Sequence, residues 1–530
     1  MTSPDSTSGS SDRVAYDWPL ILAAGVVPLL LGAVVMLRRP DLVFTVDFLT
    51  HDQGVQLLIG DRLASGAMLY RDLAYPYGPL PAYVLAAAAL LGGLSAQVYL
   101  SLVCALGAAF LMVLTHALRQ HVDRATAASV VLLGVLPLTA TPGAVLGGYT
   151  NNSYIGLERM LLATLVLAWR PPDRRSAAAS VWLGLIFGTW QLVKFGGAAF
   201  GIAAWLAVDA LSFWRRPSSF SAVEYVRRLC LTLGVFGTIE ACRWATLFAV
   251  LPRDVAWDVA WPAYTAQLYA TLAEGASTVW PGSLTEFATQ WLPVCAGIVL
   301  SVAAAVSVAR RRCNERQVVL LLPAAFYVMA NLGYLGHAHT VRQYVWTWIP
   351  AATLLLHRRQ RALQLFAVCA VAPAVALALK IALVNQPLVG LQEARMPNGD
   401  RLWVDSARAV QLPRLLAEMT RPVPTFAMTA AGGLYFYADA QLPTRHPWLL
   451  PAYVRPYEAA VTSSALRESG ELLILDETAT TPEQAAALVD AVFGPGMFST
   501  LETRGATLQG LAPNWWLLEA ESAPAPSAAR

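Results

Sequence analysis

The sequence has few charged residues: only 13% of its 530 positions are Asp, Glu, Lys or Arg, whereas 56% are hydrophobic. A soluble domain carries about 25% charged residues, because its surface must be hydrated. The low content therefore excludes an ordinary soluble enzyme and a disordered protein. The net charge of +3 is too small to indicate a polyanionic partner, so no nucleic-acid partner is predicted. The chain is an integral membrane protein by composition.

Lysine is almost absent: the chain has only Lys194 and Lys380, against 35 arginines. With the abundant alanine, this bias indicates a GC-rich bacterial genome, and we expect a multi-pass protein of the bacterial inner (cytoplasmic) membrane. The six cysteines lack the spacing of metal ligands. Neither a disulfide framework nor a zinc site is predicted.

Long apolar runs predict an α-helical polytopic membrane protein. A spanning helix needs roughly 20 apolar residues. Eleven such runs begin near Trp18, Ala96, Ala125, Gly156, Ser176, Phe195, Leu229, Trp291, Gln317, Gln343 and Ala362. The shorter stretch Pro79 to Gly93 is rich in proline at its start, and we expect a re-entrant or interfacial helix there.

Arginine-rich loops predict the orientation, because such loops stay in the cytoplasm. Five of them alternate with the apolar runs: Arg119–Arg124, Arg170–Arg175, Arg215–Arg228, Arg310–Arg316 and Arg358–Arg361. Residues 1–17 then form a disordered cytoplasmic tail, and residues 38–95 and 252–290 lie outside. Arg38 and Arg39 fall on the outer side and violate the rule.

The balance of charge changes after the last apolar run. Residues 1–384 contain 27 basic and 19 acidic groups, whereas residues 385–530 contain 10 and 15. We therefore predict a membrane domain over 18–384 and a small extracytoplasmic α/β domain over 385–530 with a disordered tail. Its expected elements are strands at Val423–Thr429, Glu471–Leu475 and around Leu517, and a helix from Thr481 to Phe493.

The first outer loop concentrates polar side chains directly after a span. They are Asp47, His51, Asp52, Asp61, Arg71 and Asp72. Gln53–Ser65 predicts a short amphipathic helix on the membrane surface, with Asp52 as candidate N-cap. Tyr75, Tyr77 and Tyr83 suit the membrane interface. Each acid has the alternative of capping a helix or hydrating the loop.

Several short motifs resemble one family of membrane enzymes. They are Asp52-Gln53-Gly54, Gly66, Leu69-Tyr70-Arg71-Asp72, Gly78-Pro79-Leu80, Gln191-Leu-Val-Lys194-Phe-Gly-Gly, Arg342-Gln-Tyr344 before Pro350, and Tyr435 through Arg445. The chain resembles GT-C superfamily glycosyltransferases, in particular the protein-mannosyltransferase and aminoarabinose-transferase-like branch (glycosyltransferase family 39). That family usually has two acids where this chain has Asp52-Gln53, so Asp47 stays open as an alternative.

The resemblance implies a GT-C-like fold and a glycosyltransferase over 18–384. Such enzymes move a sugar from a polyprenyl-phosphate donor in the bilayer to an acceptor hydroxyl of a lipid, glycan or protein, with inversion when one carboxylate acts. The implied general base is Asp52, or Asp47 in its place. The implied substrate-binding residues are Lys194, Arg342, Arg71, Tyr70, Asp72 and Glu158. No cofactor is certain, and a divalent metal (Mg or Mn) is an open alternative.

Other interpretations remain at this stage. Lys194 has the alternative of reaching the interface with its long side chain. Glu240 and Arg243, spaced i, i+3 on one helix face, favour a structural ion pair, with a substrate role as the alternative. Aromatic residues in 252–290 form either an interfacial belt or a lid. For the whole chain, a transporter or lipid-linked sugar flippase is the main alternative, and a membrane scaffold is the third.

Overall fold

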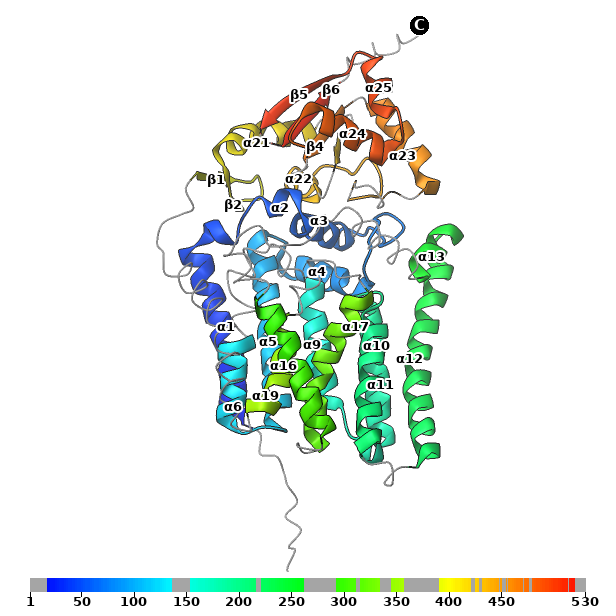
Figure 1. Ribbon diagram of the computed structural model, residues 1–530. Helices are drawn as coiled ribbons and strands as arrows, with labels where there is room; N and C mark the ends of the chain where they lie inside the picture. Colours follow the sequence, from blue (N-terminus) through cyan, green and yellow to red (C-terminus); the bar gives the residue numbers. More distant parts are fainter. Residues whose placement is uncertain are drawn as a thin grey trace, which may run out of the picture.

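The computed structural model describes residues 17–135, 153–215, 221–261, 292–310, 315–333, 345–356, 390–420 and, with short gaps, 425–519. They form a helical bundle with a mixed α/β domain stacked on one end (Figure 1). We call the end of the bundle next to this domain the domain-facing end, and the opposite end the far end.

The bundle helices run alternately toward and away from the C-terminal domain (Figure 1). They are α1 (Trp18–Arg38), α5 (Ala96–Arg119), α6 (Arg124–Ser129) with the π-helical turn η2 (Val130–Val135), α9 (Ser153–Ala168), α10 (Ala177–Val193), α11 (Gly197–Arg215), α12 (Ala222–Val250), α16 (Leu292–Ala309), η7 and α17 (Glu315–Leu321 and Leu322–Gly333), and η8 and α19 (Val345–Trp348 and Ile349–Leu356). Short helices η4 (Pro172–Arg174) and α13 (Arg253–Ala260) lie at the ends of the bundle.

Helix is present in each predicted apolar run except the last, Ala362 to Val384, which lies outside the described residues. By length and composition, four described helices can cross a membrane: α1, α5, α11 and α12. Shorter apolar helices accompany them, α10 among them. On the apolar part of α12, Leu233 is 39% exposed and Val250 46% exposed. Such an apolar outer face is expected of a helix that contacts lipid, and the predicted polytopic fold class is confirmed.

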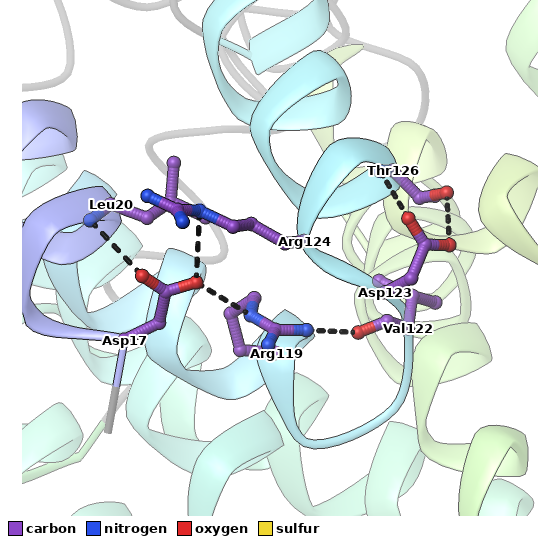
Figure 2. A network of polar contacts seen from close by, with 7 residues as sticks. All are labelled: Asp17, Leu20, Arg119, Val122, Asp123, Arg124 and Thr126. Carbon is purple, nitrogen blue, oxygen red and sulfur yellow. Dashed lines mark hydrogen bonds and ion pairs between the residues drawn. The ribbon is translucent and has the colours of Figure 1, made fainter. Parts of the chain in front are cut away.

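Ion pairs at the far end join three helices (Figure 2). The Asp17 carboxylate accepts from the backbone N–H of Leu20 at the start of α1, and lies 3.2 Å from Arg119 Nε and 3.3 Å from Arg124 Nε. The predicted basic loop Arg119–Arg124 thus lies opposite the C-terminal domain. Within it, Asp123 caps α6 by accepting from the N–H of Thr126 at 2.9 Å.

Arg39, one of the two arginines that violate the positive-inside rule, forms a buried ion pair. Arg39 Nη2 lies 2.9 Å from Asp41 Oδ2, and both side chains are nearly inaccessible. Asp41 belongs to the 3-10 turn η1 (Pro40–Leu42) that follows α1. The pair offsets the cost of burying the Arg39 charge, whereas Arg38 and Arg39 still depart from a rule that counts Lys and Arg rather than net charge.

The first loop forms helices α2 (Asp47–Thr50), α3 (Asp52–Ala64) and α4 (Pro79–Gly92). The prediction of an amphipathic helix on the membrane surface was wrong for α3, because every residue from Gln53 to Gly60 is buried. A Cβ at Gly60 would lie 2.8 Å from Leu85 of α4. A Cβ at Gly54 would lie 2.7 Å from Gly433 of the C-terminal domain. Helix α3 is therefore packed between α4 and that domain.

The C-terminal domain is a mixed α/β structure, as predicted. Its elements are β1 (Leu391–Arg395), β2 (Arg401–Asp405), α21 (Ser406–Met419), β3 (Phe426–Met428), α22 (Gly432–Tyr437), α23 (Pro456–Ser469), β4 (Glu471–Leu475), α24 (Pro482–Phe493), α25 (Met497–Glu502), β5 (Thr507–Ala512) and β6 (Trp515–Glu519). One sheet has the order β3-β4-β6-β5, in which only β3 and β4 are parallel. Strands β1 and β2 form a separate hairpin.

Hydrogen bonds fasten this domain to the domain-facing end. The N–H of Trp403 in β2 donates to the carbonyl of Phe44 at 2.6 Å. Asp400 accepts from the N–H of Ala96, the first residue of α5, at 2.8 Å. Arg62 of α3 donates to the carbonyl of Ala440 at 2.8 Å. The domain thus contacts the first loop over several separate segments.

Candidate active site

Lys194 lies at the domain-facing end of α10, and it is only 3% exposed. Its Nζ lies 3.7 Å from Oε2 of Glu158, which is 1% exposed and belongs to α9. An isolated charge at this depth is costly, and pairing with an opposite charge offsets that cost. The alternative in which Lys194 reaches the interface is wrong. Lys194 and Glu158, both predicted from the sequence, are brought together.

Trp190 and two glycines complete the surroundings of Glu158. Trp190 Nε1 donates to Glu158 Oε1 at 3.0 Å. A Cβ at Gly197 would lie 2.7 Å from the same oxygen and 2.5 Å from Trp190 Nε1, so only glycine fits. Gly196 has a φ of +87°, which a side chain disfavours. The Phe-Gly-Gly sequence after Lys194 therefore keeps space around the ion pair.

Four tyrosines line one side of the Lys194–Glu158 pair, and we call Tyr70, Tyr75, Tyr77 and Tyr154 the tyrosine wall. The Tyr154 ring centroid lies 5.8 Å from Lys194 Nζ, within range of a cation–π contact. Tyr77 stacks on Tyr154 with centroids 4.2 Å apart, and Tyr75 meets Tyr77 edge to face at 5.4 Å. Tyr75 and Tyr77 are buried, so their predicted interfacial position was wrong.

The Gly78-Pro79-Leu80 turn directly meets the end of α10. Gly78 donates its N–H to the carbonyl of Val193 at 3.2 Å. A Cβ at Gly78 would lie 2.8 Å from the backbone nitrogen of Val193, and closer still to the carbonyl of Leu192. Two motifs separated by more than a hundred residues thus meet by backbone contact beside Lys194. The glycine is required by this close approach.

The Leu69-Tyr70-Arg71-Asp72 motif is a tight turn. Tyr70 has a left-handed φ of +66°, and its hydroxyl donates to the Tyr77 carbonyl at 2.7 Å. Asp72 accepts from the N–H of Met68 and from Arg71 Nε, each at 2.8 Å. These bonds lower the pKa of Asp72 to about 2, with the Arg71 bond as the largest cause. Tyr70 is buried in the wall, whereas Arg71 and Asp72 are exposed and bind each other.

The candidate bases Asp47 and Asp52 lie on α2 and α3, and both are half-buried. Asp52 is the first residue of α3, while His51 occupies the predicted N-cap position. Asp47 Oδ1 lies 3.4 Å from His51 Nδ1. Burial raises the pKa of the Tyr75 hydroxyl, and interactions with Tyr70, Tyr154, Tyr99 and Asp52 raise it further. Asp52 is therefore within electrostatic reach of the tyrosine wall.

For Arg243, a further cation near the wall, the sequence favoured a structural ion pair over a substrate role. Arg243 Nε donates to Glu240 Oε2 at 2.8 Å, which confirms the predicted ion pair on α12. Arg243 also donates to the carbonyl of Ala260 at 2.9 Å, and its guanidinium lies 5.1 Å from the Phe195 ring centroid. Burial raises the pKa of Tyr70, and Arg243 opposes that shift by attraction. Arg243 contacts the ring of Phe195, which directly follows Lys194, and we therefore include Arg243 in the candidate site.

Some predicted residues fall outside the part of the chain that the structure describes. They are Arg342, His337 and His339, and most of the aromatic loop beyond Trp261. Trp257 and Trp261 are exposed and pack against Trp244. Among the described residues, no three His, Cys, Asp or Glu side chains are grouped as metal ligands.

Solved structures match the fold of this chain over nearly its whole length. ArnT from Cupriavidus metallidurans bound to undecaprenyl phosphate is 15% identical, with a TM-score of 0.51, over 95% of this chain and 98% of that chain. The Archaeoglobus fulgidus oligosaccharyltransferase tethered to an acceptor peptide is 14% identical, with a TM-score of 0.50, over 94% and 74%. The chain has the GT-C fold.

The GT-C fold, which short sequence motifs predicted, is confirmed by structural comparison. No family model and no curated protein matches the sequence. The apo form of the same ArnT matches as well, at 13% identity and a TM-score of 0.51. Identities this low establish the fold of the chain, and the chemistry must be argued from its own residues.

Proposed function

We propose that this GT-C-fold chain is a membrane glycosyltransferase that moves a sugar from a polyprenyl-phosphate donor to an acceptor hydroxyl. One observation carries the proposal: a buried Lys194–Glu158 pair lies against the tyrosine wall at the end of the bundle where the acidic first loop packs. The similar ArnT was solved bound to undecaprenyl phosphate, which supports the same class of donor here.

Lys194 is the proposed contact for the donor phosphate. Its ammonium group is held inside the bundle by Glu158, so it meets an incoming phosphate without first losing a water shell. A cation in a low-dielectric site stabilises the negative charge that develops on a leaving phosphate. Arg243 and, from its sequence motif, Arg342 are the further cations proposed for this role. Aromatic faces of the tyrosine wall suit the sugar ring.

Asp52 is the proposed general base, with Asp47 as the alternative. The carboxylate accepts the proton of the acceptor hydroxyl, whose oxygen forms a bond to the anomeric carbon. The bond from that carbon to the phosphate oxygen breaks, and the electron pair leaves with the phosphate. One direct displacement inverts the anomeric centre. The bonds formed and broken in this step balance without a metal.

The proposed setting follows from the arrangement of charges. We place the far end, with its basic loops, in the cytoplasm, and the C-terminal domain outside the bacterial inner membrane. The acceptor then approaches from the side of α2 and α3, while the donor enters from the bilayer. The acceptor is a lipid, glycan or protein hydroxyl.

The proposal is tested with the purified full chain in liposomes, by release of polyprenyl phosphate from a panel of labelled polyprenyl-phosphate sugars. Asp52→Asn is expected to slow turnover by about 10²–10⁴-fold, the usual contribution of a general base. Binding of undecaprenyl phosphate should stay unchanged. Asp61→Asn, on the same helix, is the matched control. Full turnover by both Asp52→Asn and Asp47→Asn, or sugar-lipid flux without any new glycosidic bond, refutes the proposal in favour of a scaffold or flippase.

A further inference from the structure

One side chain of the C-terminal domain reaches the backbone of the tyrosine wall. Arg445, in the segment between α22 and α23, donates from Nη1 to the carbonyl oxygen of Tyr70 at 2.5 Å. In return, the carbonyl of Arg445 accepts from the N–H of Ala74 at 2.6 Å. These two bonds bracket the Tyr70 turn from both sides.

Arg445 is itself held in place. Its Nε donates to Oε1 of Glu458 on α23, and the other carboxylate oxygen lies 2.7 Å from Nε2 of His446. The His446 side chain is almost fully buried, and those of Arg445 and Glu458 are largely buried. Ion pairs with this geometry are rigid and directional. The guanidinium is therefore presented to Tyr70 in a fixed orientation.

The turn that Arg445 holds needs such support. Tyr70 adopts φ +66°, a conformation that is strained for a residue with a side chain. Such a conformation persists only where neighbouring contacts impose it. Within the turn, the N–H of Tyr70 donates to the carbonyl of Leu73 at 2.8 Å. The contact from outside the turn at the Tyr70 carbonyl comes from Arg445.

A continuous set of contacts leads from this turn to the Lys194 pair. The Tyr70 hydroxyl donates to the Tyr77 carbonyl at 2.7 Å, and the Tyr77 hydroxyl donates to that of Tyr154 at 3.3 Å. The Tyr154 ring in turn faces Lys194 Nζ. These contacts connect Arg445, through Tyr70, Tyr77 and Tyr154, to the proposed phosphate contact.

We propose that Arg445 is a positioning residue: from the C-terminal domain it fixes the Tyr70 turn and thereby the tyrosine wall against Lys194. On this proposal the C-terminal domain contributes to the geometry of the donor site. The effect on phosphate binding rests on the proposed function, whereas the effect on the turn does not.

The experiment uses the purified full chain and two readouts. Hydrogen exchange of residues 66–78 reports the turn, with residues 96–119 of α5 as internal reference. Binding of undecaprenyl phosphate reports the site. Arg445→Ala is expected to raise exchange in 66–78 at least tenfold and to weaken binding at least fivefold, with α5 unchanged. Arg504→Ala is the matched control, because Arg504 is exposed and bonds a carbonyl within the same domain.

A double-mutant cycle separates positioning from a general loss of stability. Tyr70→Phe keeps the ring but removes the bond to the Tyr77 carbonyl. If Arg445 acts through Tyr70, adding Arg445→Ala to Tyr70→Phe weakens binding by less than the product of the two single effects. Should Arg445→Ala fail to fold, Arg445→Lys and Glu458→Gln, which keep part of the hydrogen bonding, replace it in the same cycle.

Unchanged exchange in 66–78, or binding effects that multiply independently, overturns the inference. If exchange rises but the wild-type chain binds no undecaprenyl phosphate, Arg445 still positions the turn and the proposed function is the part that fails. If the wild type binds and Arg445→Ala binds equally well, the positioning role is refuted while the proposed function stands.

Discussion

Removing the charge of Glu158 tests whether the buried ion pair holds Lys194 for chemistry or for stability. Glu158→Gln keeps an oxygen that accepts from Trp190 Nε1, so the tryptophan loses no hydrogen bond. It removes the carboxylate 3.7 Å from Lys194 Nζ, where both side chains are at most 3% exposed. Breaking a buried pair on one side costs about 3–5 kcal/mol.

The double variant Lys194→Met/Glu158→Gln separates the two roles. With both charges gone, neither member of this pair is left charged without the other, and replacing a buried pair by uncharged side chains is often neutral or stabilising by about 1–4 kcal/mol. We therefore expect its stability to return to the wild-type value. Its affinity for undecaprenyl phosphate should be lost all the same, because the ammonium group is absent.

The free energy of unfolding is measured by SDS titration in mixed micelles, and affinity by equilibrium binding of undecaprenyl phosphate. Lys194→Met alone, which leaves Glu158 charged, serves as the opposite single variant and should be about as unstable as Glu158→Gln. The reasoning is refuted if Glu158→Gln is as stable as the wild type, or if the uncharged double variant binds phosphate normally.

Two further predictions concern close packing and pH. Gly78→Ala brings a Cβ against the Leu192 carbonyl oxygen and within 2.8 Å of the Val193 nitrogen. We therefore expect the free energy of unfolding in the same titration to fall by about 1–3 kcal/mol. Gly107→Ala, with open space around the glycine, is the control and should be tolerated. Burial alone would raise the pKa of Glu458, but hydrogen bonds from His446 and Arg445 outweigh it and hold that pKa at about 2, below the ordinary 4.5. The stability that Glu458 contributes is therefore present above about pH 5 and lost as pH falls toward 2. Glu458→Gln should flatten this part of the curve of unfolding free energy against pH. An unchanged slope contradicts the assignment.

The sequence predicted the bundle well because apolar length is a local property. Helix α4 was expected to be too short to cross, and it spans only Pro79–Gly92. In the C-terminal domain, β4 and α24 begin and end within one residue of the predicted positions, since Thr481 forms a capping box. Strand β5 and the β1–β2 hairpin were not predicted, because their residues are largely polar or exposed.

The errors arose where tertiary contacts override local pattern. The sequence around α3 has polar residues at intervals typical of an interfacial helix, but Gly54 allows the backbone of Gly433 to approach and cover it. Tyrosines in a loop next to a span, such as Tyr75 and Tyr77, are typical of an interfacial belt, yet both are buried in the tyrosine wall. The pairing of Lys194 with Glu158, far apart in sequence, follows from no single motif and needed the bundle geometry.

The close contact between the first loop and the C-terminal domain has a consequence for biosynthesis. Arg445 is separated from Tyr70 by 375 positions, and Gly433 packs on the backbone of Phe48 and Leu49. At roughly 5–20 residues per second, the loop waits about 20–75 s for these partners to be translated. During that interval the Tyr70 turn lacks its contacts from the C-terminal domain. We therefore expect a chain truncated before that domain to insert its helices without fixing the Tyr70 turn.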